Sequence, residues 1–271
     1  RARLGCAFTP AALLNVEVTL IHGYTRKLHN LLHTVEWYPA IRAEPGTDWV
    51  PRVKIFSGKA AASYHQAKLI IKLTNDIART VNNDPTVRGL LKVVFLPNYN
   101  VSLAESIIPA ADLSEQISTA GFEASGTSNM KFGLNGALTI GTMDGANVEM
   151  HERVGAEHMF IFGLSAQQVE TRKHAGEFNA GPDIAASHRL NDVLQAIRGG
   201  VFSPDDTGRY VGLIDGLIDY DRFLVCADFD SYWDAQARVE AHLHDSKVWW
   251  RSAVLNTARM GWFSSDRTIR T

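Results

Sequence analysis

Strand and helix patterns alternate through the first third of the chain, and this alternation constrains the fold more than any other feature. Strand patterns cover residues 13–21, 52–56 and 90–96, and the helix patterns between them begin near Tyr24 and Tyr64. The third strand pattern is a continuous apolar run, which is typical of a parallel strand covered on both faces. The sequence therefore predicts an α/β fold with a doubly wound, mostly parallel sheet and right-handed crossovers.

The rest of the chain adds two short strand candidates and then becomes helical. The strand candidates cover residues 137–140 and 159–162. Helical spacing then recurs at residues 165–173, 185–198, 206–218, 231–244 and 246–260. No repeat, low-complexity tract or linker interrupts the sequence. Residues 1–271 are therefore expected to form a single domain that ends in helices.

Composition argues against several classes of protein. The 271 residues carry a formal net charge of −2, so no nucleic-acid partner and no anionic membrane are expected. No apolar run approaches the roughly 20 residues that a membrane span needs. Cys6 and Cys226 lie far apart and are expected to be free thiols in a reducing compartment, the cytoplasm. The ten histidines lack the spacing of a metal site.

Polar segments follow the predicted strands. His22 follows the first strand, residues 57–59 follow the second and residues 97–100 follow the third. In open parallel sheets, ligands bind outside the carboxyl ends of the strands. These segments are therefore expected to lie at the ligand-binding edge of the sheet.

Residues 123–135 carry the most informative chemistry. They read Glu-Ala-Ser-Gly-Thr-Ser-Asn-Met-Lys-Phe-Gly-Leu-Asn, a short polar loop that runs into a predicted helix. The backbone N–H groups and hydroxyls of Gly126, Thr127 and Ser128 are donors of the kind that bind an anion such as phosphate. This stretch is therefore a candidate phosphate site.

Lys131 falls in or near the first turn of that helix, where the helix dipole disfavours its charged form. A lysine held beside phosphate-binding groups is a candidate amine for a Schiff base with an aldehyde. A solvated surface lysine next to an ordinary turn explains the same residues, so chemistry alone leaves both interpretations open.

Residues 123–135 resemble the pyridoxal-phosphate attachment signature of the α-glucan phosphorylases, the family of glycogen, starch and maltodextrin phosphorylases. The resemblance continues through residues 98–105, 108–121, 136–150 and 263–269. It spans nearly the whole chain, from about Leu14 to Ile269. The fold that it implies is the Rossmann-like C-terminal domain of a glycosyltransferase-B type fold.

The resemblance also implies a set of site residues, each of which matches a family position that contacts cofactor or sugar. Lys131 would carry pyridoxal 5'-phosphate as a Schiff base and is the implied catalytic position. The cofactor contacts would be Thr127, Ser128 and Tyr99, and the substrate contacts would be Glu123, Ser125, Gly126 and Tyr24. A carboxylate such as Glu123 suits a sugar because it accepts hydrogen bonds from two hydroxyls.

The activity that the resemblance implies is phosphorolysis of α-1,4-glucan to glucose 1-phosphate, a glycosyl transfer to inorganic phosphate. Family members are far longer than 271 residues, and this chain begins at Arg1 without a methionine. It is therefore expected to be the C-terminal half of a phosphorylase, with the N-terminal domain absent. The full-length parent is expected to be a homodimer, and the isolated fragment is expected to be inactive because half of the cleft is missing.

The first strand departs from the family pattern. The family reads Val-Lys-Arg-Ile-His-Glu-Tyr-Lys-Arg-Gln, whereas this chain reads Val-Thr-Leu-Ile-His-Gly-Tyr-Thr-Arg-Lys. Thr19, Leu20 and Thr25 stand where the family has cations that hold phosphates. Each charge-assisted hydrogen bond contributes roughly 1.5–3 kcal/mol, so three losses should cost several kcal/mol. Arg26 or Lys27 is expected to compensate only if the following helix rotates or frays.

Two alternatives follow from these patterns. The first is a non-catalytic relative that keeps the fold, with or without the cofactor, but has lost phosphate activation. The second is a nucleotide-sugar glycosyltransferase of similar architecture, which accounts for the α/β pattern but not for the Lys131 segment.

Overall fold

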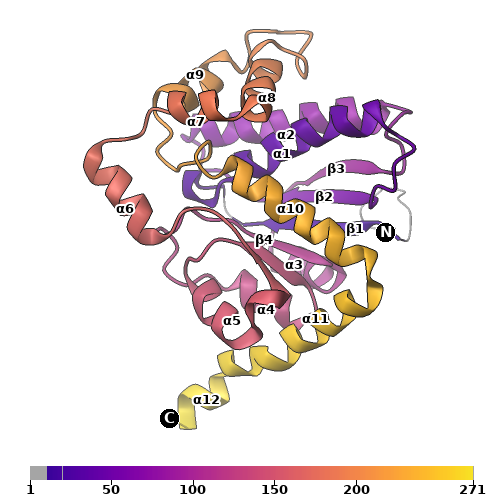
Figure 1. The fold of residues 1–271 in the computed structure, drawn as a ribbon, viewed down its shortest axis with the longest axis vertical. Coiled ribbons are helices and arrows are strands. Elements are labelled where there is room, and N and C mark those ends of the chain that lie inside the picture. Colours follow the sequence, from indigo (N-terminus) through magenta and orange to yellow (C-terminus); the bar gives the residue numbers. More distant parts are fainter. Residues whose placement is uncertain (1–10, 20, 271) are drawn as a thin grey trace.

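Six parallel strands form one sheet in the computed structural model, which describes residues 11–19 and 21–270. The strands are β1 (Leu13–Val18), β2 (Arg52–Ser57), β3 (Leu91–Leu96), β4 (Leu113–Gln116), β5 (Leu138–Gly141) and β6 (Met159–Ile161). Their order is β3-β2-β1-β4-β5-β6, and every pairing is parallel. The predicted doubly wound α/β fold is confirmed, and Figure 1 shows the sheet between its layers of helices.

The direction of winding reverses beside β1. The chain moves outward from β1 through β2 to β3, then returns to the other side of β1 and continues through β4, β5 and β6. Asn15 and Val16 of β1 pair with Leu113 and Ser114 of β4. The loops that follow β1 and β4 therefore leave the sheet side by side, at the position where doubly wound sheets bind ligands.

Twelve α-helices accompany the sheet in the part of the chain that the structure describes. They are α1 (Lys27–Ala43), α2 (His65–Asn83), α3 (Val101–Ile107), α4 (Ser128–Leu134), α5 (Ala146–Val154), α6 (Ala166–Ala175), α7 (Gly181–Ala186), α8 (His188–Arg198), α9 (Val211–Asp219), α10 (Phe229–His244), α11 (Ser246–Arg259) and α12 (Ser265–Arg270). Short 3-10 turns are η2 (Gly23–Thr25), η3 (Ile108–Ala110), η4 (Ala156–His158) and η5 (Met260–Phe263).

Alternate residues of each strand pack on opposite faces of the sheet. Phe56 and Val93 join a core with α1, α2, α8 and α9. Val53 and Ile55 point the other way and pack with apolar residues of α3 and α4. Helix α10 covers β4, β5 and β6 on the same face as α1, because its residue Tyr232 packs with Leu113 and Phe160. Both faces are covered, as the continuous apolar runs predict.

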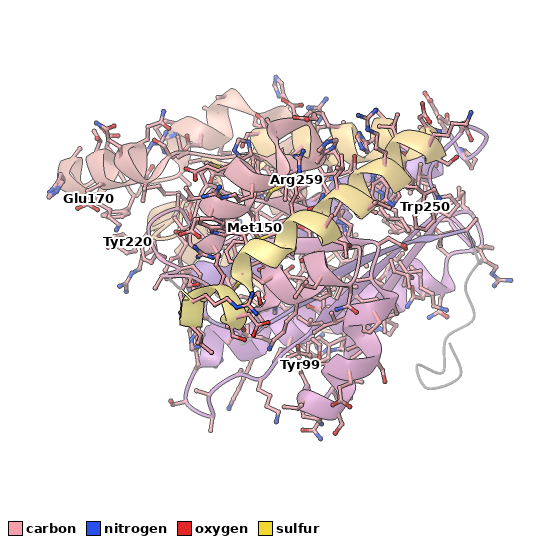
Figure 2. The ribbon with its side chains drawn as sticks, turned by 90° about the horizontal axis from the view of Figure 1, so that it is seen from below. Tyr99, Met150, Glu170, Tyr220, Trp250 and Arg259 are labelled. Atoms are coloured by element: carbon pink, nitrogen blue, oxygen red, sulfur yellow. The ribbon has the colours of Figure 1, made fainter. Side chains whose placement is uncertain are left out.

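The predicted C-terminal helices are confirmed, although some boundaries differ. The segment predicted at residues 185–198 is interrupted at Ser187, whose hydroxyl accepts a hydrogen bond from the Leu190 N–H and so begins α8. Helix α9 begins at Val211 rather than at residue 206, because the preceding loop holds Arg209 against α2. Figure 2 shows α11 along one side of the molecule, with Trp250 near its start and Arg259 at its end.

Strand β4 is absent from the sequence-based prediction. Its segment reads Leu-Ser-Glu-Gln, and the polar residues Ser114 and Glu115 are buried. The Glu115 carboxylate accepts hydrogen bonds from Asn15 at 2.8 Å and from the Tyr232 hydroxyl at 2.9 Å. A buried strand whose side chains bond to one another lacks the apolar alternation on which strand prediction depends.

Glu115 belongs to a layer of buried polar side chains between the central strands and helices α1 and α10. Glu17 and Lys54 lie in the same layer, each less than 3% exposed. The Lys54 ammonium donates to Asn30 Oδ1 at 2.7 Å, and Asn30 Nδ2 donates to Glu17 Oε2 at 3.0 Å. Burial is tolerated because the charges alternate in sign and share hydrogen bonds.

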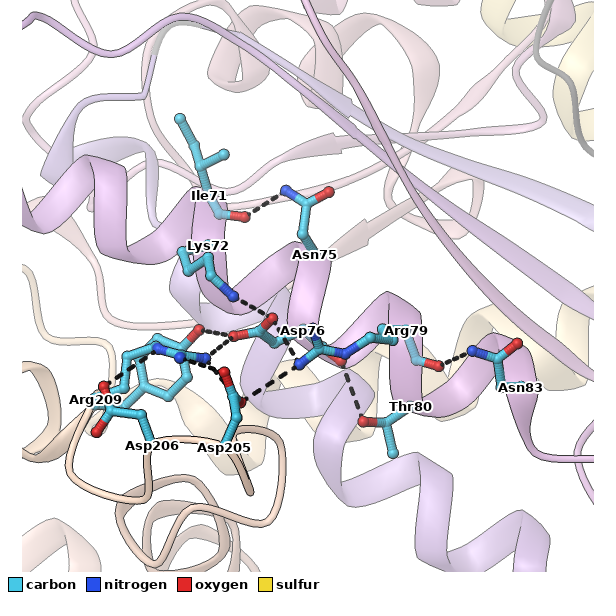
Figure 3. Close-up of polar contacts among 11 residues, drawn as sticks. Ile71, Lys72, Asn75, Asp76, Arg79, Thr80, Asn83, Asp205, Asp206 and Arg209 are labelled. Atoms are coloured by element: carbon cyan, nitrogen blue, oxygen red, sulfur yellow. Dashed lines mark hydrogen bonds and ion pairs between the residues drawn. The ribbon is translucent and has the colours of Figure 1, made fainter.

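A second polar cluster fastens α2 to the loop before α9 (Figure 3). The Asp76 carboxylate lies at its centre and is 1% exposed. It accepts hydrogen bonds from Lys72, from the Tyr210 hydroxyl at 2.5 Å and from Arg209 at 3.1 Å. Arg79 lies 3.1 Å away as a further ion-pair partner. Burial raises the pKa of Asp76, but the hydrogen bonds from Lys72, Tyr210 and Arg209, together with the Lys72 charge, outweigh burial and lower it.

None of the helices in residues 11–19 and 21–270 combines the length and apolar character that crossing a bilayer requires. Cys226 is buried as a free thiol, and Cys6 lies outside the described residues.

Candidate active site

A cavity of about 790 Å³ opens at the carboxyl ends of β1 and β4, where the winding of the sheet reverses. All eight site residues predicted from the sequence line this cavity. They are Tyr24, Tyr99, Glu123, Ser125, Gly126, Thr127, Ser128 and Lys131. Residues from three separate parts of the chain therefore meet at the predicted edge of the sheet.

The turn between β1 and α1 forms one wall of the cavity. It passes through η2, and Arg26 then adopts a left-handed backbone conformation with φ of 54°. The Arg26 guanidinium is buried, donates to the Ile117 carbonyl at 2.7 Å and pairs with the Asp228 carboxylate at 2.5 Å. These bonds hold the arginine inside the protein, so it does not supply positive charge to the cavity.

Asp144 fixes the opposite wall. Its carboxylate accepts hydrogen bonds from the Gly121 N–H at 2.9 Å, the Glu123 N–H at 2.9 Å and the Ser118 hydroxyl at 2.7 Å. Asp144 follows β5 and is buried, whereas the loop that it holds follows β4. The Asp144 carboxylate therefore fixes the backbone of Glu123, whose side chain lines the cavity.

The Lys131 segment forms the floor. Gly126 has a positive φ of 81°, which few side chains would tolerate, and it turns the chain into α4. The Ser128 hydroxyl lies 3.2 Å from the side-chain oxygen of Gln116, the last residue of β4. Lys131 lies in α4 with its side chain exposed along the cavity. Helix α4 has only seven residues, so side chains carry more of the anion-binding potential than the helix dipole does.

Tyr24 lies between the two walls. Its ring stacks on His22, with centroids 5.6 Å apart, and on Phe122 at 6.4 Å. Burial and the neighbouring Glu123 carboxylate raise the pKa of the Tyr24 hydroxyl. Tyr99, labelled in Figure 2, precedes α3, and burial raises its pKa as well. Both hydroxyls therefore stay protonated and able to donate near neutral pH.

Carboxylates outnumber cationic side chains in the lining of the cavity. Among the described residues that line it, four are carboxylates: Glu17, Glu115, Glu123 and Asp144. Lys131 is the only lysine or arginine in the same described lining. The described residues contain no cluster of three or more histidine, cysteine or acidic side chains able to hold a metal ion.

Comparison with known sequences identifies the family. The family model described as carbohydrate phosphorylase matches residues 1–271. The chain belongs to the carbohydrate phosphorylase family.

Several curated phosphorylases are similar to this chain. It is 51% identical over 266 residues to the glycogen phosphorylase of Pasteurella multocida and 50% identical over 268 residues to that of Synechocystis sp.. It is also 50% identical over 265 residues to the brain form of glycogen phosphorylase from Bos taurus. The matches cover 98%, 99% and 98% of this chain but only 32%, 31% and 31% of the relatives. The chain spans about a third of the length of these phosphorylases.

The residues of this phosphorylase cavity fit a phosphorylated aldehyde. An accessible lysine amine, two hydroxyls at Thr127 and Ser128 and a volume of about 790 Å³ suit a covalently bound ligand with one phosphate. A second phosphate fits less well, because the described lining supplies one lysine, Lys131, against four carboxylates. Thr19 and Thr25 line the cavity with hydroxyls where the family pattern has lysines, and Leu20 lies outside the described residues.

Sequence reasoning missed two residues that shape the site. Asp144 belongs to the stretch that resembles the phosphorylases. The sequence holds one signal of its role, its position shortly after the predicted strand at residues 137–140. Lys27 was expected to compensate for the missing cations only if its helix rotated or frayed; in the structure Lys27 is buried behind the cavity and reaches it through Thr19. Its ammonium donates to Thr19 Oγ1 at 2.9 Å from the first residue of an intact α1.

Proposed function

We propose that this chain is the cofactor-binding domain of an α-glucan phosphorylase, with pyridoxal 5'-phosphate bound covalently to Lys131. The full protein would cleave α-1,4-glucan with inorganic phosphate and release glucose 1-phosphate. The observation that carries the proposal is that Lys131 and the seven other predicted residues line one cavity at the reversal point of the sheet. About 50% identity to named glycogen phosphorylases supports it.

Each residue has a role in this proposal. Lys131 holds the cofactor, Thr127 and Ser128 donate hydrogen bonds to its phosphate, and Tyr99 packs along it. When bound, the cofactor supplies a phosphate group that can exchange a proton with substrate phosphate. Glu123 accepts hydrogen bonds from glucosyl hydroxyls, and Tyr24, Ser125 and Gly126 orient the same sugar. Asp144 keeps Glu123 in place through the Glu123 N–H.

The rest of a phosphorylase would supply the opposite side of the cleft. The relatives are about three times as long as this chain, so two thirds of their length has no counterpart here. We therefore infer that the 271-residue domain alone does not degrade glucan. We also propose that the full protein is a cytoplasmic enzyme and that it forms a homodimer. Glucose 1-phosphate formed by the isolated domain would contradict the first of these statements.

Trapping the bound aldehyde tests the central claim. The domain is incubated with pyridoxal 5'-phosphate, reduced with borohydride and digested, and the modified peptide is identified by mass spectrometry. We expect one modified lysine, Lys131, and loss of modification in Lys131→Ala. The matched control is Lys68→Ala, since Lys68 is exposed on α2 and does not line the cavity. Modification spread evenly over surface lysines, or retained in Lys131→Ala, would overturn the claim.

The acid excess of the cavity favours one alternative, a relative that binds cofactor but does not activate phosphate. Its test needs the full-length parent, with Thr19→Lys, Leu20→Arg and Thr25→Lys introduced together. If the alternative holds, the parent releases no glucose 1-phosphate and the triple variant gains activity. A normal rate in the unaltered parent would eliminate it.

A further inference from the structure

Binding a phosphate in an acid-rich cavity requires positive charge from behind the cavity wall. Four buried cations lie near β1 and β2, and three are committed elsewhere. Arg26 pairs with Asp228, Arg52 donates to Gln236 at 2.5 Å, and Lys54 donates to Asn30 at 2.7 Å. The fourth, Lys27, donates to a side-chain hydroxyl of the cavity wall, Thr19 Oγ1. Arg26 reaches the same wall only through the backbone carbonyls of Ile117 and Ser118.

Lys27 reaches back from the first residue of α1 toward the end of β1. Its ammonium donates to Thr19 Oγ1 at 2.9 Å and lies 3.4 Å from the Glu17 carbonyl oxygen. Lys27 is 3% exposed, whereas Thr19 lines the cavity. Because the ammonium occupies an acceptor site of the Thr19 oxygen, it polarises that hydroxyl toward donation with its own proton.

Thr19 lies at the end of the cavity where phosphate is expected. It follows β1, and Gln116 ends the neighbouring strand β4. The Gln116 side-chain oxygen lies 3.2 Å from the hydroxyl of Ser128, one of the two residues assigned to the cofactor phosphate. Thr19, Gln116 and Ser128 all line the same cavity.

We propose that Lys27, acting through the Thr19 hydroxyl, is a positioning residue that supplies positive charge to the phosphate-binding end of the cavity. This inference rests on the proposed function. It assigns a source of charge within this chain that takes the place of side chains missing from the first strand.

The neighbouring Glu17 does not cancel this charge completely. Its Oε1 lies 3.6 Å from the Lys27 ammonium, beyond hydrogen-bond distance, and its Oε2 accepts from Asn30. The charged groups that face Glu17 are Lys27, Lys54 and Glu115. Burial, together with the Glu115 charge, outweighs both lysines and raises the pKa of Glu17 to about 7. Near neutral pH this carboxyl is therefore partly protonated. Burial lowers the pKa of Lys27, and the charges of Glu17 and Glu115 oppose that shift. The bond to Thr19 holds the Lys27 amine against the cavity wall.

Two aldehydes that differ by one phosphate test the proposal. Apparent dissociation constants are measured for pyridoxal 5'-phosphate and for pyridoxal on the wild-type domain and on Lys27→Met. We expect the constant for pyridoxal 5'-phosphate to rise about tenfold in Lys27→Met, because one nearby charge is lost. Pyridoxal carries no phosphate, so its constant should stay within about twofold. A structural role alone would weaken both aldehydes equally, and that result would overturn the proposal.

Three further variants sharpen the result. Lys27→Arg keeps the charge and should restore most of the affinity for pyridoxal 5'-phosphate. Thr19→Val removes the hydroxyl with little change of shape and should reproduce part of the loss, which keeps the test decisive if Lys27→Met does not fold. Lys68→Met removes an exposed lysine of α2 that does not line the cavity and should leave the ratio of the two constants unchanged. A ratio altered equally by Lys68→Met and Lys27→Met would count against the proposal.

The experiments distinguish failure of the proposed function from failure of the inference about Lys27. If neither aldehyde modifies Lys131, the proposed function fails, and titration with inorganic phosphate then decides the role of Lys27 alone. Weaker phosphate binding in Lys27→Met than in the wild type would support that role, and equal or undetectable binding would refute it. If Lys131 is modified but the ratio of constants is unchanged in Lys27→Met, only the inference about Lys27 fails.

Discussion

Asp76 and Glu17 are both buried carboxylates with cationic neighbours, yet their pKa values move in opposite directions. The pKa of Asp76 is lowered, whereas burial raises that of Glu17 to about 7. Of the three cations around Asp76, Lys72 and Arg79 keep 45% and 54% of their side chains exposed, and Arg209 keeps 17%, so two of the three charges remain well hydrated. Lys27 and Lys54, which face Glu17, are buried with it.

The difference shows that the exposure of the cationic partners decides whether the pKa of a buried carboxyl is lowered or raised. Hydrated cations around Asp76 favour its charged form at little cost, so the cluster acts as a clamp between α2 and the loop before α9. A carboxyl whose partners are also desolvated stays close to its protonation midpoint near neutral pH. Glu17 is such a carboxyl, and it lines the candidate active site, so the charge of the cavity changes with pH near neutrality.

The largest expected effect comes from removing the centre of the clamp. Asp76→Asn removes the charge and one of the two oxygens that accept from Lys72, Arg209 and Tyr210, and we expect a loss of about 3 kcal/mol in the free energy of unfolding. Urea denaturation at pH 7 measures it. Asp205→Asn is the matched control, because Asp205 pairs with the same Arg209 from an exposed position, and its midpoint should not change. Equal effects of the two variants would break the comparison.

A pH series separates the two carboxyls. Glu17 binds its proton more tightly in the folded state, so its contribution to stability is lost as pH rises from 4.5 to about 7. Between pH 5 and 7 this loss should amount to about 2 kcal/mol and should be absent from Glu17→Gln. Asp76 has the opposite sign, since its contribution is lost only as pH falls below its usual value of 3.8. A Glu17→Gln curve parallel to the wild type would contradict this assignment.

Removing one hydroxyl from the clamp should have a smaller effect. Tyr210→Phe deletes the hydrogen bond to Asp76 but keeps the ring in the core, so we expect a loss of about 1.5 kcal/mol. Thermal unfolding at pH 7 is the measurement. The loss should vanish in the Asp76→Asn background, and a loss that persists there would assign the effect to ring packing instead.

The smallest effect is expected at the hydrated rim of the clamp. Lys72 pairs with Asp76 but is half-exposed, so Lys72→Met should change stability by about 0.5 kcal/mol or less. Raising the salt concentration should reduce even that difference. A loss as large as that of Asp76→Asn would mean that the exposed cation, rather than the buried hydrogen bonds, holds the clamp together.

The sequence predicts the fold well wherever apolar periodicity reflects burial. Strands β1, β2 and β3 and the long helices are of this kind, because each carries several buried apolar residues at the spacing of a strand or a helix, even where polar residues are buried beside them. Strand β4 could not be found in that way. Its buried Glu115 depends on Asn15 and Tyr232, which are distant in sequence, and local patterns carry no signal of such partners.

The candidate site divides in the same way. Its predicted residues line one cavity, as expected. They could be predicted because the motif at residues 123–135 and the segments that follow parallel strands are both visible in local sequence. The contact of Lys27 with Thr19 was not predicted, because it depends on the left-handed turn at Arg26. That turn is stabilised by partners more than 90 residues away along the chain, Ile117 and Asp228.

The bonds of Arg26 also set an order of assembly. This side chain ties the junction after the first strand to the carbonyl oxygens of Ile117 and Leu224 and to the carboxylate of Asp228. Contacts across such long loops close late, after local elements have formed. A ribosome that has not yet released Asp228 therefore carries a nascent domain whose early strands can pair but whose cleft is still open. Residues 224–228 therefore supply the last partners of the junction that residues 21–26 begin.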